Sequence, residues 1–441
     1  MLTRSSEATT APSSSGTSLS VAWLFDNTTT DSTGNYNGSL VNNADYGTSS
    51  QTMPYLGQGQ TLFLVQSMNQ NQSFQVDNSV LNLAYTSFTI ETWIYPSIVT
   101  GDNGIFGICQ CSSCSNQCLY LLIRGARLYA GFYLNDINGL LTVTVNTWHH
   151  IVFVYNYETQ QQILYINEVQ DNSKSNSACL QGTNATINIG STQLLLTKNY
   201  FSGHIDNLRI VTRAKSASEI LSDASLIAYY SFDLPSPNYD SGPNGLHGSS
   251  VNTASVTGRV NQAMRFIGSS SYFQAYGFYQ LGYGVNHHRP FSIALWINPT
   301  STAPCVFLQQ STTATGGSCM NMLGLWTSTG SASQAAQIVA QGYAWPTIYG
   351  PFITINTWIH ISWTFSLANG YALYVNGNYY GTTGYFSYTG TTGVITWLQL
   401  GYNFGCSSQY ITNAAYQGSI DEVYLYNREL SATEVRTLAN P

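Results

Sequence analysis

The chain alternates short hydrophobic runs with polar breaks along almost its whole length. The runs are rich in Val, Ile, Thr, Tyr and Trp, the breaks are rich in Gly, Asn, Ser and Pro, and helical periodicity is nearly absent. Residues 151–155 and 162–167 form one predicted hairpin, and residues 361–365 and 372–377 form another, closed by Asn369-Gly370. The pattern predicts an all-β fold.

The same sequence pattern occurs twice, about 210 residues apart. The recurring segments are an opening Phe-Asp with an Asp-Ser turn, Phe-x-Ile-x-x-Trp-Ile, Asn-Thr-Trp-x-His-Ile, Gly-x-Ile-Asp and Ser-x-x-Glu. The Ser-x-x-Glu steps that begin at Ser216 and Ser431 are capping boxes, and each predicts a helix. Two tandem antiparallel β-sandwiches are the economical way to bury these alternating strands.

The repeat also divides the chain. Residues 1–18 are polar and low in complexity, which predicts a flexible Ser/Thr-rich linker. Residues 19–224 and 225–441 are the two domains, and each is long enough for a hydrophobic core of its own.

The recurring segments resemble the laminin-G-like jelly rolls of the concanavalin A-like lectin/glucanase superfamily, and the resemblance covers residues from about 19 to 440. It implies two tandem antiparallel jelly-roll domains of the concanavalin A-like kind. It does not select one function, because this superfamily includes lectins, glycosidases, adhesion modules and spacers.

Composition narrows the range of partners. Only 7% of the residues are charged and the net charge is −7, so no basic stripe is available to neutralise phosphates. We therefore expect neither nucleic acid nor an anionic membrane as partner. No window has the apolar length of a membrane helix, and residues 1–18 lack the apolar core of a secretory signal, so we expect any signal or anchor segment to lie outside this chain.

Cysteines and glycosylation triplets favour an extracellular or cell-surface glycoprotein. The acceptor triplets all lie in the first copy, at Asn27, Asn37, Asn71 and Asn184. Eight cysteines divide five to three between the copies, so either one bridge joins the domains or two thiols stay free. We expect Cys319 to pair with Cys406 and Cys111 with Cys118, with Cys109 as a competitor. The alternative is a zinc site that includes Cys111 and Cys114.

Glycosidases of this superfamily need two neighbouring carboxylates, and no Glu-x-Asp-x-x-Glu run is present. Glu91 lies on a predicted strand, but its counterpart in the second copy is Ala294. We therefore do not expect an enzyme.

The resemblance suggests structural calcium at Asp206 and Asp421, with Asp31 or Asp240 as a further ligand. Calcium requires six to eight oxygens, so no single aspartate is a site. The alternative is that Asp31 and Asp240 form Asx-turns, while Asp206 and Asp421 pair with Arg209, Arg213 or Arg428.

Aromatic rings that are flat and exposed can stack on sugars, with amides bonding the hydroxyls. The candidate carbohydrate-binding residues are Tyr129, Tyr133, Trp345 and Tyr349, although aromatics also fill sandwich cores.

The leading hypothesis is a non-catalytic extracellular carbohydrate-binding or adhesion protein with glycans or extracellular proteins as partners. The alternative is a structural or assembly module that associates with proteins or with itself and binds no sugar. A glycosidase-like enzyme is third.

Overall fold

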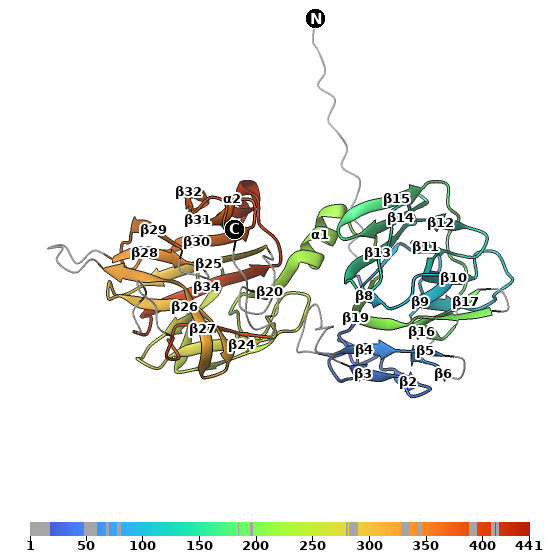
Figure 1. Cartoon of the computed structure of the whole chain (residues 1–441), viewed down its shortest axis with the longest axis horizontal. Coiled ribbons are helices and arrows are strands. Elements are labelled where there is room, and N and C mark those ends of the chain that lie inside the picture. Colours follow the sequence, from blue (N-terminus) through green and yellow to red (C-terminus); the bar gives the residue numbers. More distant parts are fainter. Residues whose placement is uncertain are drawn as a thin grey trace, which may run out of the picture.

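The computed structural model describes residues 18–47, 60–67, 70–76, 81–183, 185–194, 197–278, 281, 290–327, 336–342, 346–387, 395–406, 411 and 414–441. It contains two β-sandwiches, which we call domain 1 and domain 2, joined through helix α1 (Figure 1). The all-β prediction and the tandem repeat are confirmed.

Domain 1 packs an eight-stranded sheet against a seven-stranded sheet. The eight-stranded sheet is ordered β15 (Val169–Lys174), β14 (Gln161–Ile166), β13 (His149–Asn156), β8 (Phe88–Pro96), β19 (Gly203–Val211), β4 (Thr61–Leu64) and β3 (Asp45–Gly47), and β1 (Ser20–Trp23) also pairs with β19. The seven-stranded sheet is ordered β12 (Asp136–Asn138), β11 (Arg127–Gly131), β10 (Cys118–Arg124), β9 (Asp102–Cys109), β16 (Ile187–Ile189), β7 (Ser73–Val76) and β2 (Ser39–Val41). Two short hairpins are β5 (Gln66–Ser67) with β6 (Gln70–Asn71) and β17 (Ser191–Leu194) with β18 (Thr197–Tyr200).

Domain 2 repeats this arrangement. Its eight-stranded sheet is ordered β22 (Thr253–Thr257), β23 (Gln262–Phe266), β34 (Gly418–Tyr426), β25 (Phe291–Pro299), β30 (Ile359–Ser366), β31 (Gly370–Val375) and β32 (Asn378–Thr382), and β20 (Leu226–Tyr230) also pairs with β34. Its seven-stranded sheet is ordered β21 (Gly248–Val251), β24 (Tyr272–Tyr276), β33 (Trp397–Leu400), β26 (Cys305–Thr313), β27 (Gly316–Thr327), β28 (Ala336–Gln341) and β29 (Thr347–Phe352). The predicted hairpins are β13–β14 and β30–β31.

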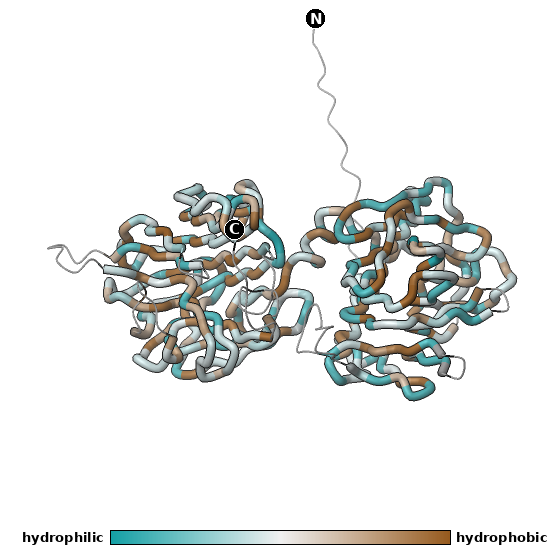
Figure 2. The backbone as a smooth tube through the Cα atoms, viewed as in Figure 1, coloured by the Kyte–Doolittle hydropathy of each residue, from teal (hydrophilic) through white to brown (hydrophobic). Residues whose placement is uncertain are grey.

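Each core lies between the two sheets, where every second side chain of a strand points inward. In domain 1 the buried cluster includes Ile90 and Ile94 of β8, and in domain 2 it includes Ile293 and Ile297 of β25. Figure 2 shows the hydrophobic segments distributed through both sandwiches and alternating with hydrophilic ones.

The two predicted helices are present, and both capping boxes are complete. Helix α1 (Ala217–Ser225) begins after Ser216, and helix α2 (Ala432–Leu438) begins after Ser431. Each cap serine accepts a hydrogen bond from the backbone of the third helical residue, whose glutamate returns one to the serine backbone. Helix α1 ends at Ser225 and β20 begins at Leu226, so the two domains follow each other without a connecting loop.

The outer face of each seven-stranded sheet is covered by the segment that leads to the last strand of its domain. In domain 1 the β17–β18 hairpin lies on β9 so closely that a Cβ at Gly104 would lie 2.3 Å from the carbonyl oxygen of Asn199. In domain 2 the segment after β33 folds back over β26 and β27, and the Cys319–Cys406 disulfide, which we expected, pins it there.

The predicted Cys111–Cys118 bridge is wrong. Cys118 lies directly opposite Cys109 in the β9–β10 register with their Cα atoms 4.0 Å apart, and these two form the disulfide. Cys111 and Cys114 then meet across the tight turn between the strands and pair with each other. Cys179 and Cys305 are free thiols, so among the described residues no disulfide joins the domains.

We predict that the Cys319–Cys406 disulfide stabilises domain 2 more than the Cys111–Cys114 disulfide stabilises domain 1. The first pair is 87 residues apart in sequence and the second pair only 3. Loop-closure entropy gives about 4.6 kcal/mol for the long loop and about 1.6 kcal/mol for the short one. Calorimetry of the Cys319→Ala/Cys406→Ala and Cys111→Ala/Cys114→Ala chains checks this, and equal losses would contradict it.

Candidate functional site

The outer face of the seven-stranded sheet in domain 2 carries aromatic and amide side chains. Along each strand they alternate with residues that point into the core. Along β24, Phe273 and Ala275 point into the core, so Tyr272, Gln274 and Tyr276 point outward and are half-buried. On the neighbouring β33, Trp397 lies opposite Tyr276 and Gln399 lies opposite Gln274.

The amides form a hydrogen-bonded row across the strands, which we call the amide ladder: Gln274, Gln399, Gln309, Asn321 and Asn403. The Nε2 of Gln309 donates to Oε1 of Gln399 at 3.2 Å, and the Nε2 of Gln399 donates to Oε1 of Gln274 at 3.4 Å. The row continues through Asn403 and Asn321, both of which donate to the carbonyl oxygen of Cys406 in the covering segment. All members except Gln274 are buried, so the amide of Gln274 is the one that reaches the surface.

Two half-buried rings flank the ladder at its β24–β33 end. The ring centroids of Tyr276 and Trp397 lie 5.1 Å apart with an interplanar angle of 42°, and we call these two residues the ring pair. Ser311 lies next to Trp397 in the sheet and donates to Oε1 of Gln399 at 2.8 Å. The face thus combines apolar rings with oriented amide and hydroxyl groups.

This face lies in an unusually neutral stretch of the sequence. From residue 266 to residue 420, a range that includes β24, β33 and the whole amide ladder, Arg289 is the only Asp, Glu, Lys or Arg. The amide ladder can therefore be satisfied only by amides, hydroxyls and backbone groups.

The sequence analysis missed the ring pair and the amide ladder. The signal was present, because Tyr272-x-Gln274-x-Tyr276 and Trp397-x-Gln399 place outward residues at the period of a strand.

In domain 1 the strands that match β24 and β33 are β7 and β16, where Nε2 of Gln75 donates to Oδ1 of Asn188 at 3.4 Å, whereas the other end of the same face, on β9 to β12, is charged. Arg124 makes two hydrogen bonds of 2.7 Å with Asp102, and its guanidinium lies 3.9 Å from the ring centroid of Tyr129. The hydroxyls of Tyr120 and Tyr129 both donate to the carboxylate of Asp136. Burial and the adjacent Asp136 carboxylate raise the pKa of Tyr129 to about 12.

The predicted sugar-stacking role of Tyr129 does not agree with this geometry. Its ring is only 9% exposed and lies under Arg124 and parallel to Tyr120, because the domain 1 sheet uses it in the charged network. Tyr133 packs against the same cluster and is half-buried. In domain 2, Tyr349 packs against Trp326 at 5.2 Å, and Trp345 lies outside the described residues.

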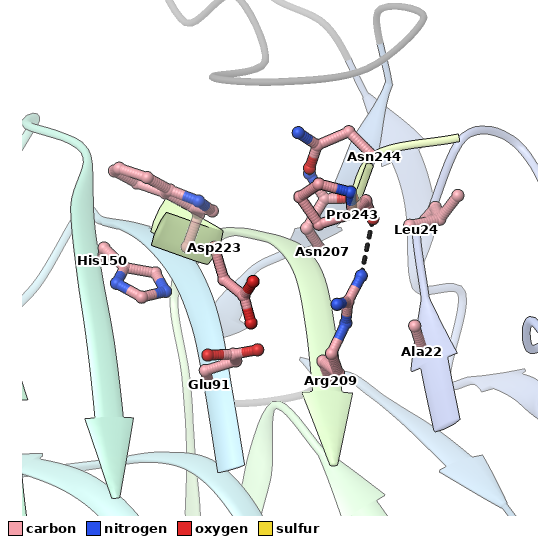
Figure 3. A pocket seen from close by; sticks show the side chains of 10 residues that line it. Ala22, Leu24, Glu91, His150, Asn207, Arg209, Asp223, Pro243 and Asn244 are labelled. Atoms are coloured by element: carbon pink, nitrogen blue, oxygen red, sulfur yellow. Dashed lines mark hydrogen bonds between the residues drawn. The ribbon is translucent and has the colours of Figure 1, made fainter. Parts of the chain in front are cut away.

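A pocket lies where domain 1 meets the opening turn of domain 2 (Figure 3). Glu91, His150 and Asp223 point toward it, and Arg209 closes it by donating from Nη2 to the carbonyl oxygen of Pro243 at 2.7 Å. It has room for about one water molecule, too little for a sugar ring.

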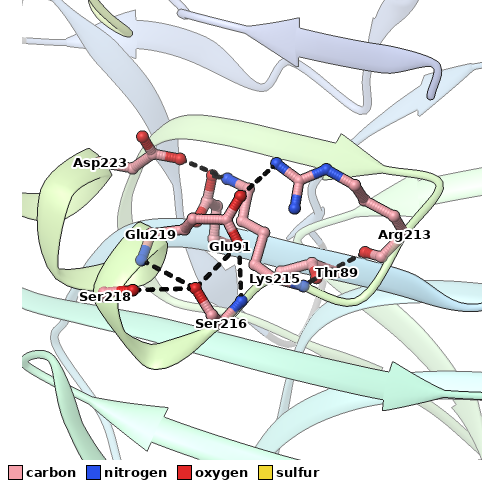
Figure 4. Close-up of polar contacts among 8 residues, drawn as sticks. All are labelled: Thr89, Glu91, Arg213, Lys215, Ser216, Ser218, Glu219 and Asp223. Carbon is pink, nitrogen blue, oxygen red and sulfur yellow. Dashed lines mark hydrogen bonds and ion pairs between the residues drawn. The ribbon is translucent and has the colours of Figure 1, made fainter. Parts of the chain in front are cut away.

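Lys215 joins the two carboxylates beside this pocket (Figure 4). Its Nζ bonds to Glu91 and, at 2.5 Å, to Asp223. Burial raises the pKa of Glu91, opposed by the charge of Lys215, and burial lowers the pKa of His150 to about 3. The arrangement is a buried ion network that supports α1 against β8, and both carboxylates are engaged by the lysine.

Comparison with known proteins places the chain in a family. The model of the concanavalin A-like lectin/glucanases superfamily matches residues 67–221 and 268–436, which is more than half of the chain. The chain belongs to this superfamily. No curated protein matches it.

Solved structures show distant likeness. Domain 4 of AbnA, a GH43 extracellular arabinanase from Geobacillus stearothermophilus, in complex with arabinotriose, is 20% identical, with 49% of this chain and 98% of that chain covered and a TM-score of 0.35. The binding domain of Paraclostridial Mosquitocidal Protein 1 is 14% identical, with 92% and 90% covered and a TM-score of 0.37. At these TM-scores the likenesses carry no argument about function.

The resemblance to the superfamily predicted calcium at four aspartates. The hydrogen bonds around each carboxylate show what it binds in this structure. In domain 2, Oδ2 of Asp421 accepts the amides of Arg259 and Val260 at 2.7 and 3.0 Å, and burial raises the pKa of Asp421 to about 7. Asp31 and Asp240 accept amides of their own turns, as the Asx-turn alternative predicted.

No group of three or more His, Cys, Asp or Glu side chains suited to a metal occurs among the residues that the structure describes. Calcium also takes backbone carbonyls and water as ligands, so calcium at Asp31, Asp240 and Asp421 stays a prediction, and we derive no function from it. Calcium at Asp206, which is fully buried, stays a prediction. The alternative ion pairs are wrong for two arginines, because Arg213 pairs with Glu219 and Arg428 with Glu434.

Three of the four glycosylation triplets can be placed. Asn27, Asn37 and Asn71 are exposed, whereas Asn184 lies outside the described residues. Glycosylation at these positions stays a prediction. Within the described ranges, no helix has both the length and the apolar character needed to cross a membrane.

We predict that Lys215→Met destabilises domain 1 by about 3–5 kcal/mol, because it removes the cation that bonds the buried Glu91 carboxylate and leaves only the more distant charge of Arg209. The loss in free energy of unfolding should become smaller as the pH falls, because the raised pKa of Glu91 lets its carboxylate take up a proton and lose the charge. Urea denaturation at several pH values measures this. Lys198→Met, at an exposed position of β18, is the control, and a pH-independent loss as small as that of the control would contradict the prediction.

Proposed function

We propose that the protein binds an uncharged carbohydrate on the outer face of the seven-stranded sheet of domain 2, through the ring pair and the amide ladder. The observation that carries this proposal is the conjunction of two half-buried rings, Tyr276 and Trp397, with a row of amides in a stretch, residues 266–420, whose one charged residue is Arg289.

Each part of the face has a role in sugar recognition. The apolar side of a pyranose ring stacks on flat aromatic rings, which Tyr276 and Trp397 supply. The amide of Gln274 is half-buried and is held by Gln399, so it can bond a sugar hydroxyl without first being ordered. Because charged groups are absent from 290 to 420, the preferred ligand is a neutral glycan and not an acidic one.

Domain 1 has a different task in this proposal. The matching strands of domain 1 have the Gln75–Asn188 pair in place of Gln274–Gln399 but Thr186 where Trp397 stands, and we propose that domain 1 positions domain 2 and binds no sugar there. We further propose that the protein is extracellular and non-catalytic. Three disulfides support the first point, and the engagement of Glu91 and Asp223 by Lys215 supports the second.

The test is isothermal titration calorimetry with cellotriose, maltotriose and triacetylchitotriose. We expect at least one to bind, and Trp397→Ala to weaken that binding at least tenfold, which corresponds to about 1.4 kcal/mol. Trp397→Phe should retain part of the affinity because it keeps a ring.

Trp148→Ala is the matched control, since it removes a half-buried indole in domain 1, away from the ring pair. The proposal fails if no trisaccharide binds, or if Trp397→Ala binds as tightly as the parent chain while remaining folded.

A further inference from the structure

At one side of domain 2, an edge strand of each sheet lies beside the other and exposes aromatic rings. Strand β32 ends the eight-stranded sheet and β29 ends the seven-stranded sheet; in the described part of the chain β32 pairs with β31 alone and β29 with β28 alone. A Cβ at Gly381 of β32 would lie 3.4 Å from Cγ2 of Ile348 of β29, so the strands are in contact. Figure 1 shows β29 toward the end of domain 2 that points away from domain 1.

Four large side chains on these strands and the loop after β32 form what we call the aromatic edge. Phe352 is 66% exposed, Tyr379 is 57%, Tyr380 is 47% and Tyr385 is 70%. With rings of about 200 Å² each, this exposes roughly 500 Å² of aromatic surface. A standard interface buries about 800 Å² on each partner, so a contact that covers all four rings would take more than half of that area from them.

Domain 1 treats the equivalent edge differently. There the side chains of β15 close over β12: Nζ of Lys174 donates to the carbonyl oxygen of Asp136 at 3.1 Å, and Oδ1 of Asp171 accepts the amides of Leu140 and Leu141 at 2.7 Å. Charged side chains on terminal strands are a common protection against association. The two edge strands and the loop after β32 carry no such charge themselves, because residues 346–387 contain no Asp, Glu, Lys or Arg; the charged neighbours Arg436 and Glu429 flank β32 at Gly377 and Asn369.

The aromatic edge is better suited to contacts between side chains than to strand addition. The β31–β32 register shifts at Tyr379 and Gly381, which leaves Tyr380 as an extra residue, and β29 is likewise irregular and contains Pro351. Such bulges and a proline interrupt the regular edge that another strand would need. The rings remain available for packing.

We propose that the aromatic edge is a self-association surface, on which a second copy of this chain packs through the same rings about a two-fold axis. Both copies carry a net charge of −7, and a contact made of uncharged residues on both sides avoids their mutual repulsion. Tyrosine suits such a self-complementary contact because its hydroxyl both donates and accepts hydrogen bonds and its ring packs against other rings. A two-fold contact closes on itself and gives a dimer, not a fibre.

Sedimentation velocity of the full oxidised chain between about 1 and 100 µM tests this proposal, a range in which complexes of standard interface size associate. We expect a concentration-dependent species of twice the 48.3 kDa chain mass. Tyr380→Lys should weaken the dimer at least tenfold, because the two-fold axis brings two new like charges together. Tyr380→Ser, which adds no charge, should weaken it less and guards against a variant that fails to fold.

Val169→Lys is the matched control, since it places the same charge at a 59% exposed position on β15 in domain 1. A chain that is monomeric at 100 µM, or a dimer that Tyr380→Lys leaves intact, would overturn the proposal. Trp397→Ala should still dimerise, and Tyr380→Lys should still bind sugar, so the two proposals fail independently. Loss of sugar binding in Tyr380→Lys without loss of the dimer would assign the aromatic edge to a glycan instead.

Discussion

A buried polar group needs a hydrogen-bond partner, and this requirement shapes the covered face of each seven-stranded sheet. In both domains the segment before the last strand folds back over the middle of that face, so outward side chains such as Tyr120 in domain 1 and Gln309 in domain 2 lose contact with water. Domain 2 meets the requirement with amides that bond one another and the covering segment. Domain 1 has one amide pair, Gln75 with Asn188, and at the other end of the sheet Arg124 bonds Asp102 while Asp136 accepts the hydroxyls of two tyrosines.

These two solutions leave different surfaces. In domain 1 the charged groups cover the tyrosine rings next to them. The guanidinium of Arg124, for example, lies over the ring of Tyr129. An amide ladder needs no rings, so Tyr276 and Trp397 stay half-buried at its end. The same fold therefore carries a closed polar network in one copy and a ring-and-amide face in the other, which is how a repeat can divide its functions.

Local patterns in the sequence predicted the architecture well. The hairpins follow from alternation, and the helices at Ser216 and Ser431 follow from capping boxes, because both signals act over a few residues. The Cys109–Cys118 pairing was missed because it depends on the β9–β10 register, where a shift of one or two residues exchanges the partners.

The candidate site was harder to predict than the fold. Whether an aromatic side chain is exposed depends on which segment crosses its sheet, and that is a long-range property. Tyr129 was selected from an aromatic run and is nearly buried, whereas Trp397 lies in a plain strand and is half-exposed. The alternation around Gln274 would have identified the outward row, but not that the row remains accessible at one end.

The most direct test of the account is a crystal structure of the oxidised chain soaked with the trisaccharide that binds most tightly. We predict a pyranose ring against Tyr276 and Trp397, with a hydroxyl bonded to the amide of Gln274. A sugar bound instead beside Arg124 and Tyr129 of domain 1, or along the aromatic edge with the ring pair empty, would contradict it.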